Sequence, residues 1–186
     1  MIEQEFTAKH GRTILLRRPR WEDLDGLLDF VNSLVREEAP INRIEEVSRS
    51  EENEFLASRL LSIEKGDIIQ LVAEVDGKIV GNAEVVKLSG RESHVGKLGV
   101  SVRSAYRRIG IATRLIELLI RQAKKEDLKI ILLAVYENNL SAITLYKKLG
   151  FKEVGRTPKG VYWKGKYVDD VKMALEIRHT HDCAER

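Results

Sequence analysis

The sequence predicts one mixed α/β domain, built on a single sheet with helices on both faces. Segments with helical spacing of apolar residues and segments of strand character follow in the order β, α, α, β, β, β, α, β, α, β, β. The chain has 186 residues and is 43% hydrophobic, which is enough for one domain with a buried core. It contains no repeat and no low-complexity segment.

The strands are predicted where apolar residues alternate or run together between turn residues. They cover residues 12–17, 68–75, 78–88, 94–102, 129–136, 151–154 and 167–177. Asp76-Gly77 is predicted as a hairpin turn. Residues 129–136 are apolar nearly throughout, which predicts a central strand covered on both faces. The last two strands are expected to pair antiparallel, with 161–167 between them as a surface hairpin.

The helices are predicted from apolar stripes and from residues that start or stop helices. They begin near Trp21, Ser48, Gly110 and Asn139. Ser48 and Glu51 form a capping box, and Asn139 can cap the last helix, which Gly150 ends. Residues 36–47 form the longest irregular connection.

Composition narrows the class of protein. The formal net charge of +3 is too small for a dense nucleic-acid-binding face, so no nucleic-acid partner is expected. Cys183 is the only cysteine, so no disulfide forms within the chain, which suits a reducing cytosol. Residues 1–10 do not resemble a signal peptide, and no apolar run is long enough to span a bilayer. We therefore expect a soluble cytoplasmic protein with no membrane partner.

The stretch from Arg107 to Thr113 joins a predicted strand to a predicted helix. The first turn of a helix has unpaired N–H groups and a partial positive charge, so arginines there are unfavourable unless an anion binds. Gly110 lets a ligand approach the backbone closely. A pyrophosphate would satisfy the N–H groups and the arginines together. The alternative is a basic turn exposed to water.

Two motifs resemble those of the GNAT superfamily of acyl-CoA-dependent N-acyltransferases. The first, R/Q-x-x-G-x-G/A after the fourth strand, is matched by Arg107, Gly110 and Ala112. The second, Asn-x-x-Ala-x-x-Leu-Tyr-x-x-x-Gly-Phe, is matched by Asn139, Ala142, Leu145, Tyr146, Gly150 and Phe151. The resemblance extends over residues 12–177. It implies a GNAT domain at 1–178, with a mostly antiparallel sheet of about seven strands and a splayed central strand pair.

The resemblance also implies acetyl-CoA as co-substrate. The residues that it implies for binding are Val100, Val102, Arg107, Arg108, Ile109, Gly110, Ile111, Ala112, Thr113, Asn139 and Tyr146. The amides from Arg108 to Thr113 would cradle the pyrophosphate, and the backbone around Val100 and Val102 would pair with the pantetheine arm like an added strand. Asn139 would contact that arm. Many members have a glycine where this chain has Arg108, whose side chain would point outward and reach the adenosine 3′-phosphate.

The expected reaction is direct attack of a neutral amine on the thioester, without a nucleophilic cysteine. Tyr146 would lie by the thioester sulfur and protonate the leaving thiolate, although a tyrosine on an apolar helix stripe also suits the core. Glu84 and His94 are candidates for the general base. For both, a structural or solvated role is the alternative, as is a base acting through a water molecule. Asn139 has the helix cap as its alternative role.

The leading hypothesis is an N-acetyltransferase that acts on the primary amine of a small molecule, such as an amino acid or a polyamine. The alternatives are a protein N-terminal acetyltransferase, for example of a ribosomal protein, and a CoA-binding module without catalysis. Residues 36–47, with four glutamates that include Glu37 and Glu38, are expected to attract the amine, and Tyr162 and Trp163 to hold it. Solvated loops are the alternative. The sequence does not decide whether the chain forms a homodimer.

Residues 179–186 form a polar tail in this prediction. His179, His181 and Cys183 alternate there, as metal ligands on an extended chain would. A site closed by a loose tail has little preorganisation, so no metal is expected.

Overall fold

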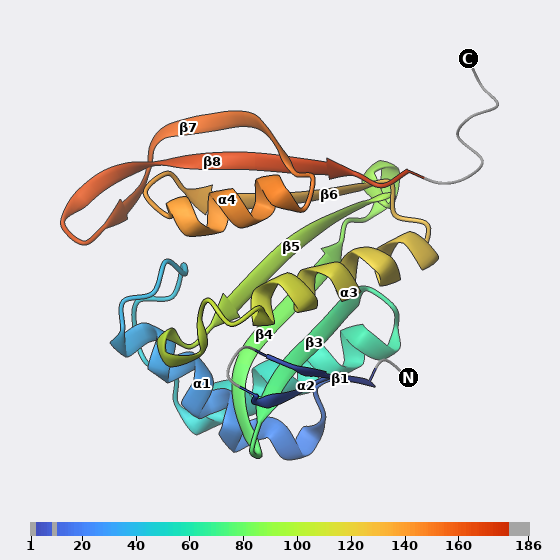
Figure 1. The fold of residues 1–186 in the computed structure, drawn as a ribbon, viewed down its shortest axis with the longest axis vertical. Coiled ribbons are helices and arrows are strands. Elements are labelled where there is room, and N and C mark those ends of the chain that lie inside the picture. Colours follow the sequence, from blue (N-terminus) through green and yellow to red (C-terminus); the bar gives the residue numbers. More distant parts are fainter. Residues whose placement is uncertain (1–2, 9–10, 179–186) are drawn as a thin grey trace. The chain divides into compact units, whose positions relative to one another are not determined.

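The computed structural model describes residues 3–8 and 11–178 (Figure 1). The chain divides into two compact units, one made of Met1–Glu84 with Gly99–Leu119 and the other of Val85–Leu98 with Ile120–Arg186. Strands β4 (Lys78–Lys87) and β5 (Val95–Val102) and helix α3 (Ile111–Lys125) each contribute residues to both units.

The strands of the first unit lie in the order β1-β2-β3-β4-β5. Besides β4 and β5, they are β1 (Glu3–Thr7), β2 (Thr13–Arg17) and β3 (Ile68–Val75). The pairs β1–β2 and β2–β3 are antiparallel. The predicted hairpin turn joins β3 to β4, and Asp76 and Gly77 both have the positive φ (50° and 75°) that a type I′ turn requires.

Strand β1 is absent from the sequence prediction, which gives about seven strands where the described residues form eight. Its sequence EQEFT has one large apolar residue, Phe6, and so lacks the alternation of a half-buried strand. Every residue of β1 nevertheless pairs with β2, from Glu3 opposite Arg17 to Thr7 opposite Thr13. The strand forms because a partner is available, and the partner cannot be read from its own sequence.

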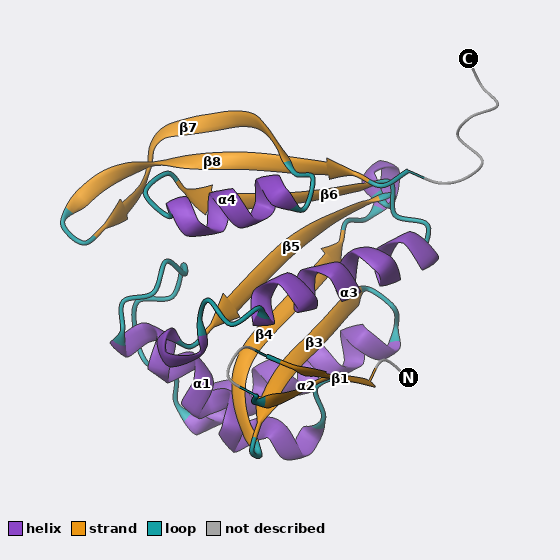
Figure 2. Ribbon diagram, in the orientation of Figure 1, coloured by secondary structure: helices purple, strands orange, loops and turns teal. Residues whose placement is uncertain are grey.

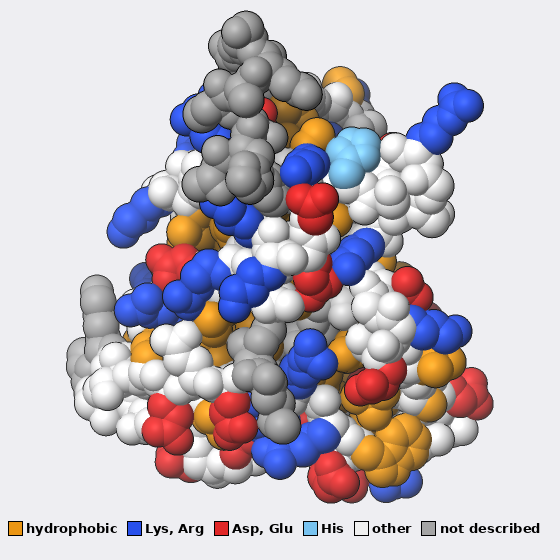
Figure 3. Space-filling model, turned by 90° about the vertical axis from the view of Figure 1, so that its right-hand side faces the viewer, with side chains coloured by type: hydrophobic (Ala, Val, Ile, Leu, Met, Phe, Trp, Pro, Cys, Tyr) orange, Lys and Arg blue, Asp and Glu red, His pale blue; other side chains and the backbone are white. Residues whose placement is uncertain are grey.

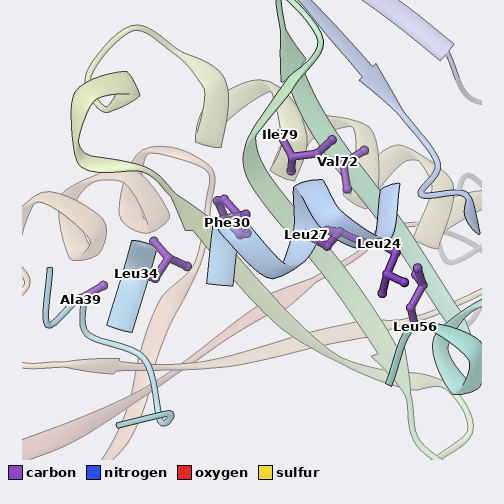
Figure 4. Close-up of a cluster of buried hydrophobic side chains, with 8 residues drawn as sticks. All are labelled: Leu24, Leu27, Phe30, Leu34, Ala39, Leu56, Val72 and Ile79. Carbon is purple, nitrogen blue, oxygen red and sulfur yellow. The ribbon is translucent and has the colours of Figure 1, made fainter. Parts of the chain in front are cut away.

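Helices α1 (Leu24–Arg36) and α2 (Arg49–Glu64) pack on one face of the first unit's sheet. The contact is a cluster of buried side chains, which Figure 4 shows: Leu24, Leu27, Phe30 and Leu34 of α1, Ala39 after it, Leu56 of α2, Val72 of β3 and Ile79 of β4. The predicted capping box starts α2, because Ser48 Oγ accepts a hydrogen bond from Glu51 N and the Glu51 carboxylate accepts one from Ser48 N.

Gly81 of β4 marks the opposite face of this sheet. A Cβ atom at Gly81 would lie 3.2 Å from Ile111 and 3.5 Å from Leu115, so the first turns of α3 pack directly on the strand. The Cβ of Ala73 in β3 would be 3.3 Å away on the same face. Helices therefore cover both faces of the first unit's sheet, as the sequence predicts.

The second unit adds β6 (Ile130–Tyr136), α4 (Leu140–Lys148), β7 (Lys152–Trp163) and β8 (Lys166–Glu176) (Figure 2). Its strands lie in the order β5-β6-β8-β7. β6 pairs antiparallel with β8 over all of its residues. β5 and β6 are parallel and pair through Val95–Lys97 and Ile130–Leu132, the first three residues of each strand. The strand pairing is therefore mixed and mostly antiparallel, as predicted.

The β7–β8 hairpin is longer than the sequence predicts. Residues 151–154 are the only part of β7 expected, because Gly155, Pro158 and Gly160 look like strand breakers. The structure accommodates them with register shifts between Glu153 and Gly155 and between Thr157 and Val161. β7 also stands at the edge of the strand order, and Pro158 lies within the second register shift, a position that tolerates proline.

Strand β6 departs from the prediction that both of its faces are covered. Ile131, Leu133 and Val135 are buried, but Ala134 on the other face is exposed and Leu132 is half-buried. An apolar run does not distinguish a fully covered strand from one with a partly open face. The prediction is therefore right for one face only.

Three features of the described residues concern possible partners: the surface charge, the length of apolar helices and the grouping of metal-ligating side chains. Lys and Arg side chains are interspersed with Asp and Glu on the face drawn in Figure 3. None of the helices in the described ranges is long and apolar enough to cross a membrane. Among the described residues, no three His, Cys, Asp or Glu side chains are grouped as metal ligands. His179, His181 and Cys183, and the rest of the tail, lie outside those residues.

The two glycines of β5 provide a stability test. A Cβ atom at Gly96 would overlap a Val85 methyl group and lie 3.1 Å from Leu128, whereas one at Gly99 would lie 3.7 Å from Glu84, an ordinary contact. We expect Gly96→Ala to lower the free energy of unfolding by about 1–3 kcal/mol through overpacking. Gly99→Ala should be neutral or slightly stabilising, because alanine loses less backbone entropy on folding. Urea denaturation of both variants measures this, and equal stabilities would contradict the packing described.

Candidate functional site

The turn between β5 and α3 contains the first predicted motif. A 3-10 turn at Ser104–Tyr106 leads away from the strand, and α3 begins at Ile111. Arg108 (φ 64°) and Gly110 (φ 99°) both have the positive φ that favours glycine. Around Gly110 an added Cβ would meet nothing within 4 Å, so backbone conformation rather than crowding requires the glycine. The φ of Arg108 also gives a physical reason for the glycine that many GNAT members have there.

Arg107 holds this turn in place. Its Nε donates a hydrogen bond to the Val102 carbonyl (2.8 Å), and its Nη2 pairs with Glu37 Oε1. The second oxygen of Glu37 accepts a hydrogen bond from Ser104 N (3.2 Å). Glu37, directly after α1, therefore ties that helix to both ends of the turn. The Arg107 side chain still exposes 42% of its surface, so its predicted contact to a ligand stays a prediction.

The start of α3 has the properties of an anion site. The first helical hydrogen bond runs from Arg114 N to Gly110 O (3.1 Å), so the amides of Ile111, Ala112 and Thr113 precede the first intrahelical donor. No acidic side chain occupies the first turn of the helix. The unpaired amides and the helix dipole favour a bound anion here.

A hollow of about 390 Å³ adjoins the same turn. Its cationic lining residues Arg36, Lys78 and Arg103 all face Asp29, at 3.8, 3.9 and 2.7 Å. Their charge is therefore partly balanced by the protein. The exposed Arg108, in contrast, forms no ion pair with the described residues.

The predicted edge for the pantetheine arm is the end of β5. Val102 is buried and Val100 is half-buried. The Val102 carbonyl already accepts a hydrogen bond from Arg107. One lone pair of this oxygen is therefore used to hold the turn. The other lone pair can still accept a hydrogen bond from an added strand.

Glu84 of β4 lies beside β5 and is paired with Arg59 of α2. Arg59 Nη2 is 3.0 Å from Glu84 Oε1, and each side chain is 20% exposed. A Cβ at Gly99 would be 3.8 Å from the same carboxylate oxygen. Burial raises the pKa of Glu84, and the charge and hydrogen bond of Arg59 partly oppose this. Arg59 was not expected from the sequence. The spacing of residues along a surface helix does not show that one of its arginines contacts a side chain of the sheet.

His94, the other candidate base, is exposed and directly precedes β5. Its backbone carbonyl accepts hydrogen bonds from Lys129 N (2.8 Å) and Ile130 N (3.3 Å), which places the start of β5 against β6 in the second unit. Seven residues of the strand, Val95 to Ser101, separate it from Val102. The geometry therefore favours Glu84 over His94 as the base near the predicted edge.

Asn139 caps α4 in the second unit, as the sequence allowed. Its Oδ1 accepts hydrogen bonds from Ala142 N (3.3 Å) and Ser141 Oγ (3.2 Å). The carboxamide oxygen is therefore committed to the helix. Only the side-chain NH₂ group is left as a donor for the predicted contact to the pantetheine arm.

Tyr146 lies near the end of α4 and is buried, with 7% of its surface exposed. Its ring packs edge to face against Phe151, with centroids 5.9 Å apart. Gly150 (φ 95°) ends the helix, and hydrogen bonds from Phe151 N to Tyr146 O (3.0 Å) and from Gly150 N to Lys147 O (3.1 Å) form a Schellman motif. This geometry accounts for the Leu-Tyr-x-x-x-Gly-Phe spacing. Burial raises the pKa of Tyr146 to about 12, so the phenol is neutral at physiological pH.

Two side chains expected to attract or hold the amine are engaged elsewhere. Glu37 is paired with Arg107 and Ser104, so its role is to shape the turn. The ring of Trp163 already has Lys164 Nζ over it at 5.0 Å and Tyr136 against it at 6.1 Å. Lys164 directly follows Trp163 in the sequence. The other partners lie far away in the chain, so the sequence offered no sign of them.

Comparison with known proteins decides the family. The model of the acetyltransferase (GNAT) family matches residues 29–151. The chain belongs to the acetyltransferase (GNAT) family. It is therefore an acetyl-CoA-dependent N-acetyltransferase.

Individual GNAT relatives differ in their acceptors. An L-amino acid N-acetyltransferase of Escherichia coli is 37% identical over 110 residues, covering 58% of this chain and 67% of the relative. An N-alpha-acetyltransferase of Sulfurisphaera tokodaii is 30% identical over 159 residues, covering 79% and 85%. The crystal structure of a GNAT-family acetyltransferase from Streptococcus pneumoniae has a TM-score of 0.78 and 26% identity, and the match covers 88% of this chain and 99% of that one.

Arg108 allows a test of the predicted contact to the adenosine 3′-phosphate. Arg108→Asn and Arg108→Gly both remove the guanidinium, and both residues tolerate a positive φ. We expect KM for acetyl-CoA to rise about 3- to 10-fold in both variants, as for one exposed charge-assisted contact. KM for acetyl-3′-dephospho-CoA should not change. Equal effects on the two thioesters, measured by thiol release, would contradict this role.

Proposed function

We propose that this enzyme transfers the acetyl group of acetyl-CoA to the primary amine of a small molecule, such as an amino acid or a polyamine. Family membership supplies acetyl transfer. The observation that carries the placement of the co-substrate is the start of α3, where unpaired amides, a glycine at φ 99° and an exposed arginine meet without an acidic side chain. In this proposal the amides from Arg108 to Thr113 bind the pyrophosphate.

The pantetheine arm and the acetyl group complete this proposal. The backbone around Val100 and Val102 pairs with the arm as a strand would. Asn139 donates to the arm through the NH₂ group that its capping role leaves unused. The residues of α4, including Tyr146, serve the sulfur end of the co-substrate.

The amine must lose a proton before it attacks. An alkyl ammonium has a pKa near ~10, so neutralising it at pH 7 costs roughly 4 kcal/mol. Glu84 accepts that proton in this proposal, and its raised pKa brings it closer to the operating pH, where a general base is most effective. The nitrogen then forms a bond to the acetyl carbon, and the carbon–sulfur bond breaks to release the CoA thiolate.

Tyr146 stabilises the leaving thiolate. The pKa of a thiol such as that of cysteine is about 8.5, whereas the pKa of Tyr146 is about 12. Complete transfer of the phenol proton would cost roughly 5 kcal/mol at this difference. Tyr146 therefore acts mainly as a hydrogen-bond donor to the developing charge, and the thiolate takes its proton finally from solvent.

Acetylation of protein N-termini is the second candidate. The similarity to an N-alpha-acetyltransferase over 79% of this chain favours it. Both functions use a neutral primary amine and the same co-substrate, so they differ only in what surrounds the amine.

Thiol release from acetyl-CoA over a panel of amines tests the proposal. The panel contains free L-amino acids, polyamines, and peptides with free N-termini. We expect release with members of the first two groups at rates well above hydrolysis. Release with peptides alone would replace the proposal with the second candidate, and no release with any amine would indicate a CoA-binding module without catalysis.

Tyr146→Phe tests the role of the phenol. The variant keeps the ring and its packing on Phe151 but removes the donor. We expect kcat to fall about 10- to 100-fold, the size of one hydrogen bond to a charged group, with the dissociation constant of acetyl-CoA changed less than about twofold. Because the pKa of Tyr146 is about 12, its ionisation should add no alkaline limb to the parent's kcat profile up to about pH 10. Unchanged turnover across that range would exclude the role.

A further inference from the structure

A cluster of four polar side chains and one aromatic ring lies between α2 and the sheet in the first unit. It consists of Phe55 and Arg59 of α2, Gln70 of β3, and Asn82 and Glu84 of β4. Arg59 bonds to Glu84 (3.0 Å), and Gln70 Nε2 donates a hydrogen bond to Asn82 Oδ1 (2.8 Å). Asn82 and Glu84 are two residues apart on one strand, so they share a face of it.

Two buried polar atoms of this cluster have no hydrogen-bond partner, Arg59 Nε and Gln70 Oε1. Gln70 is only 6% exposed, so its carboxamide oxygen has little access to bulk water. An unsatisfied buried group of this kind costs about 1–3 kcal/mol, and native proteins leave few of them. Arg59 Nε is a donor on a cationic group, and Gln70 Oε1 is an acceptor. A ligand that fits them offers both an acceptor with negative charge and a donor.

The cluster can be reached from solvent. Phe55 exposes 47% of its surface, and the Arg59 guanidinium carbon lies 4.8 Å from the centre of its ring. This cation–π contact holds the guanidinium over an exposed ring. Arg59 and Glu84 themselves are each 20% exposed. A small molecule can therefore meet Arg59 and Glu84 from solvent, and it reaches the buried Arg59 Nε and Gln70 Oε1 only after side chains adjust. A purely structural ion pair needs no exposed aromatic ring beside it.

We propose that this cluster binds a free α-amino acid as the acetyl acceptor. Arg59 binds the α-carboxylate through its guanidinium edge, and Glu84 together with Gln70 Oε1 binds the α-ammonium. The inference rests on the proposed function and adds to it the class of acceptor. Guanidinium and carboxylate form planar paired hydrogen bonds, which are among the strongest in proteins. An ammonium has three donors and suits two or three acceptors.

This arrangement also places the reacting nitrogen. Glu84 Oε1 lies beside the Gly99 position of β5, next to Val100 of the edge proposed for the pantetheine arm. An ammonium bound to Glu84 gives its proton to the group that holds it. The neutral nitrogen is then left near the strand where the thioester is expected.

A peptide N-terminus lacks the feature that Arg59 recognises. Its first residue has a neutral amide where a free amino acid has a carboxylate. A guanidinium placed against that neutral group loses the opposite charge and the paired hydrogen bonds that a carboxylate provides. The cluster therefore favours free amino acids over peptides and over polyamines, which carry no anion.

The experiment compares the 20 common L-amino acids with their α-carboxamides, using the parent and Arg59→Met. Thiol release gives kcat and KM for each acceptor. We expect Arg59→Met to lower kcat/KM for the accepted amino acids by about 30- to 100-fold, mainly through KM. The value for the matching carboxamides should change less than about threefold, and Arg59→Lys should lie between parent and Arg59→Met. Each ratio compares one acceptor with two enzymes, so differences in amine pKa cancel.

Arg49→Met is the matched control. Arg49 stands at the start of the same helix and forms an exposed ion pair with Asp25 (2.8 Å). The Arg49→Met variant should keep the kinetic constants of the parent for every acceptor. KM for acetyl-CoA and the unfolding temperature of Arg59→Met show whether that variant is correctly folded, and Arg59→Lys provides the test if it is not.

The outcomes are distinct. Equal losses for amino acids and carboxamides, no loss for either, or release with peptides or polyamines but not with amino acids would overturn the inference while acetyl transfer stands. No release with any amine from the parent enzyme would overturn the proposed function itself. A selective loss with amino acids supports the inference.

Discussion

The pairing of Arg107 with Glu37 holds the turn on which the proposed co-substrate site depends. Arg107 bonds to the end of β5 and to the residue after α1, and Glu37 bonds in turn to Ser104. These contacts allow two residues to keep a positive φ, at Arg108 and Gly110. A turn with such a backbone is strained unless its surroundings fix it. Once it is fixed, the amides of Ile111, Ala112 and Thr113 precede the first intrahelical donor and the first turn of α3 carries no acid, so an anion is the natural ligand.

The same contacts change the meaning of the charged residues around the turn. Glutamates in residues 36–47 suggest attraction of a cationic substrate, but Glu37 serves as a counter-ion for Arg107. An acidic group suited to an amine is Glu84, which is half-buried and paired with Arg59 on the face of the sheet. In the proposal, recognition of the acceptor therefore shifts from a surface loop to side chains that α2, β3 and β4 hold in place. Rigid elements position such groups more accurately than loops do.

The sequence predicted the helices well because their signals are local. The capping box at Ser48, the cap at Asn139 and the stop at Gly150 all form as the residues indicate. It failed where structure depends on a partner strand. β1 has no periodic pattern of its own, and the breakers in β7 are tolerated because bulges and an edge position accommodate them. For the site, the motifs located the turn at Arg107–Gly110 and the helix bearing Tyr146. They did not reveal Arg59 or Gln70, because a contact between α2, β3 and β4 leaves no trace in spacing along the chain.

The most direct test of the account is acetyl-CoA binding to Gly110→Val, measured by calorimetry. Gly77→Val is the control, because Gly77 also has a positive φ (75°) with open space around it, but in the β3–β4 hairpin turn. Both variants should lose some stability from backbone strain. We expect the dissociation constant of acetyl-CoA to rise by more than about 30-fold in Gly110→Val and by less than about twofold in Gly77→Val, because only the first obstructs a phosphate group bonded to several amides. Binding to folded Gly110→Val as tight as to the parent would contradict the placement of the pyrophosphate at the start of α3.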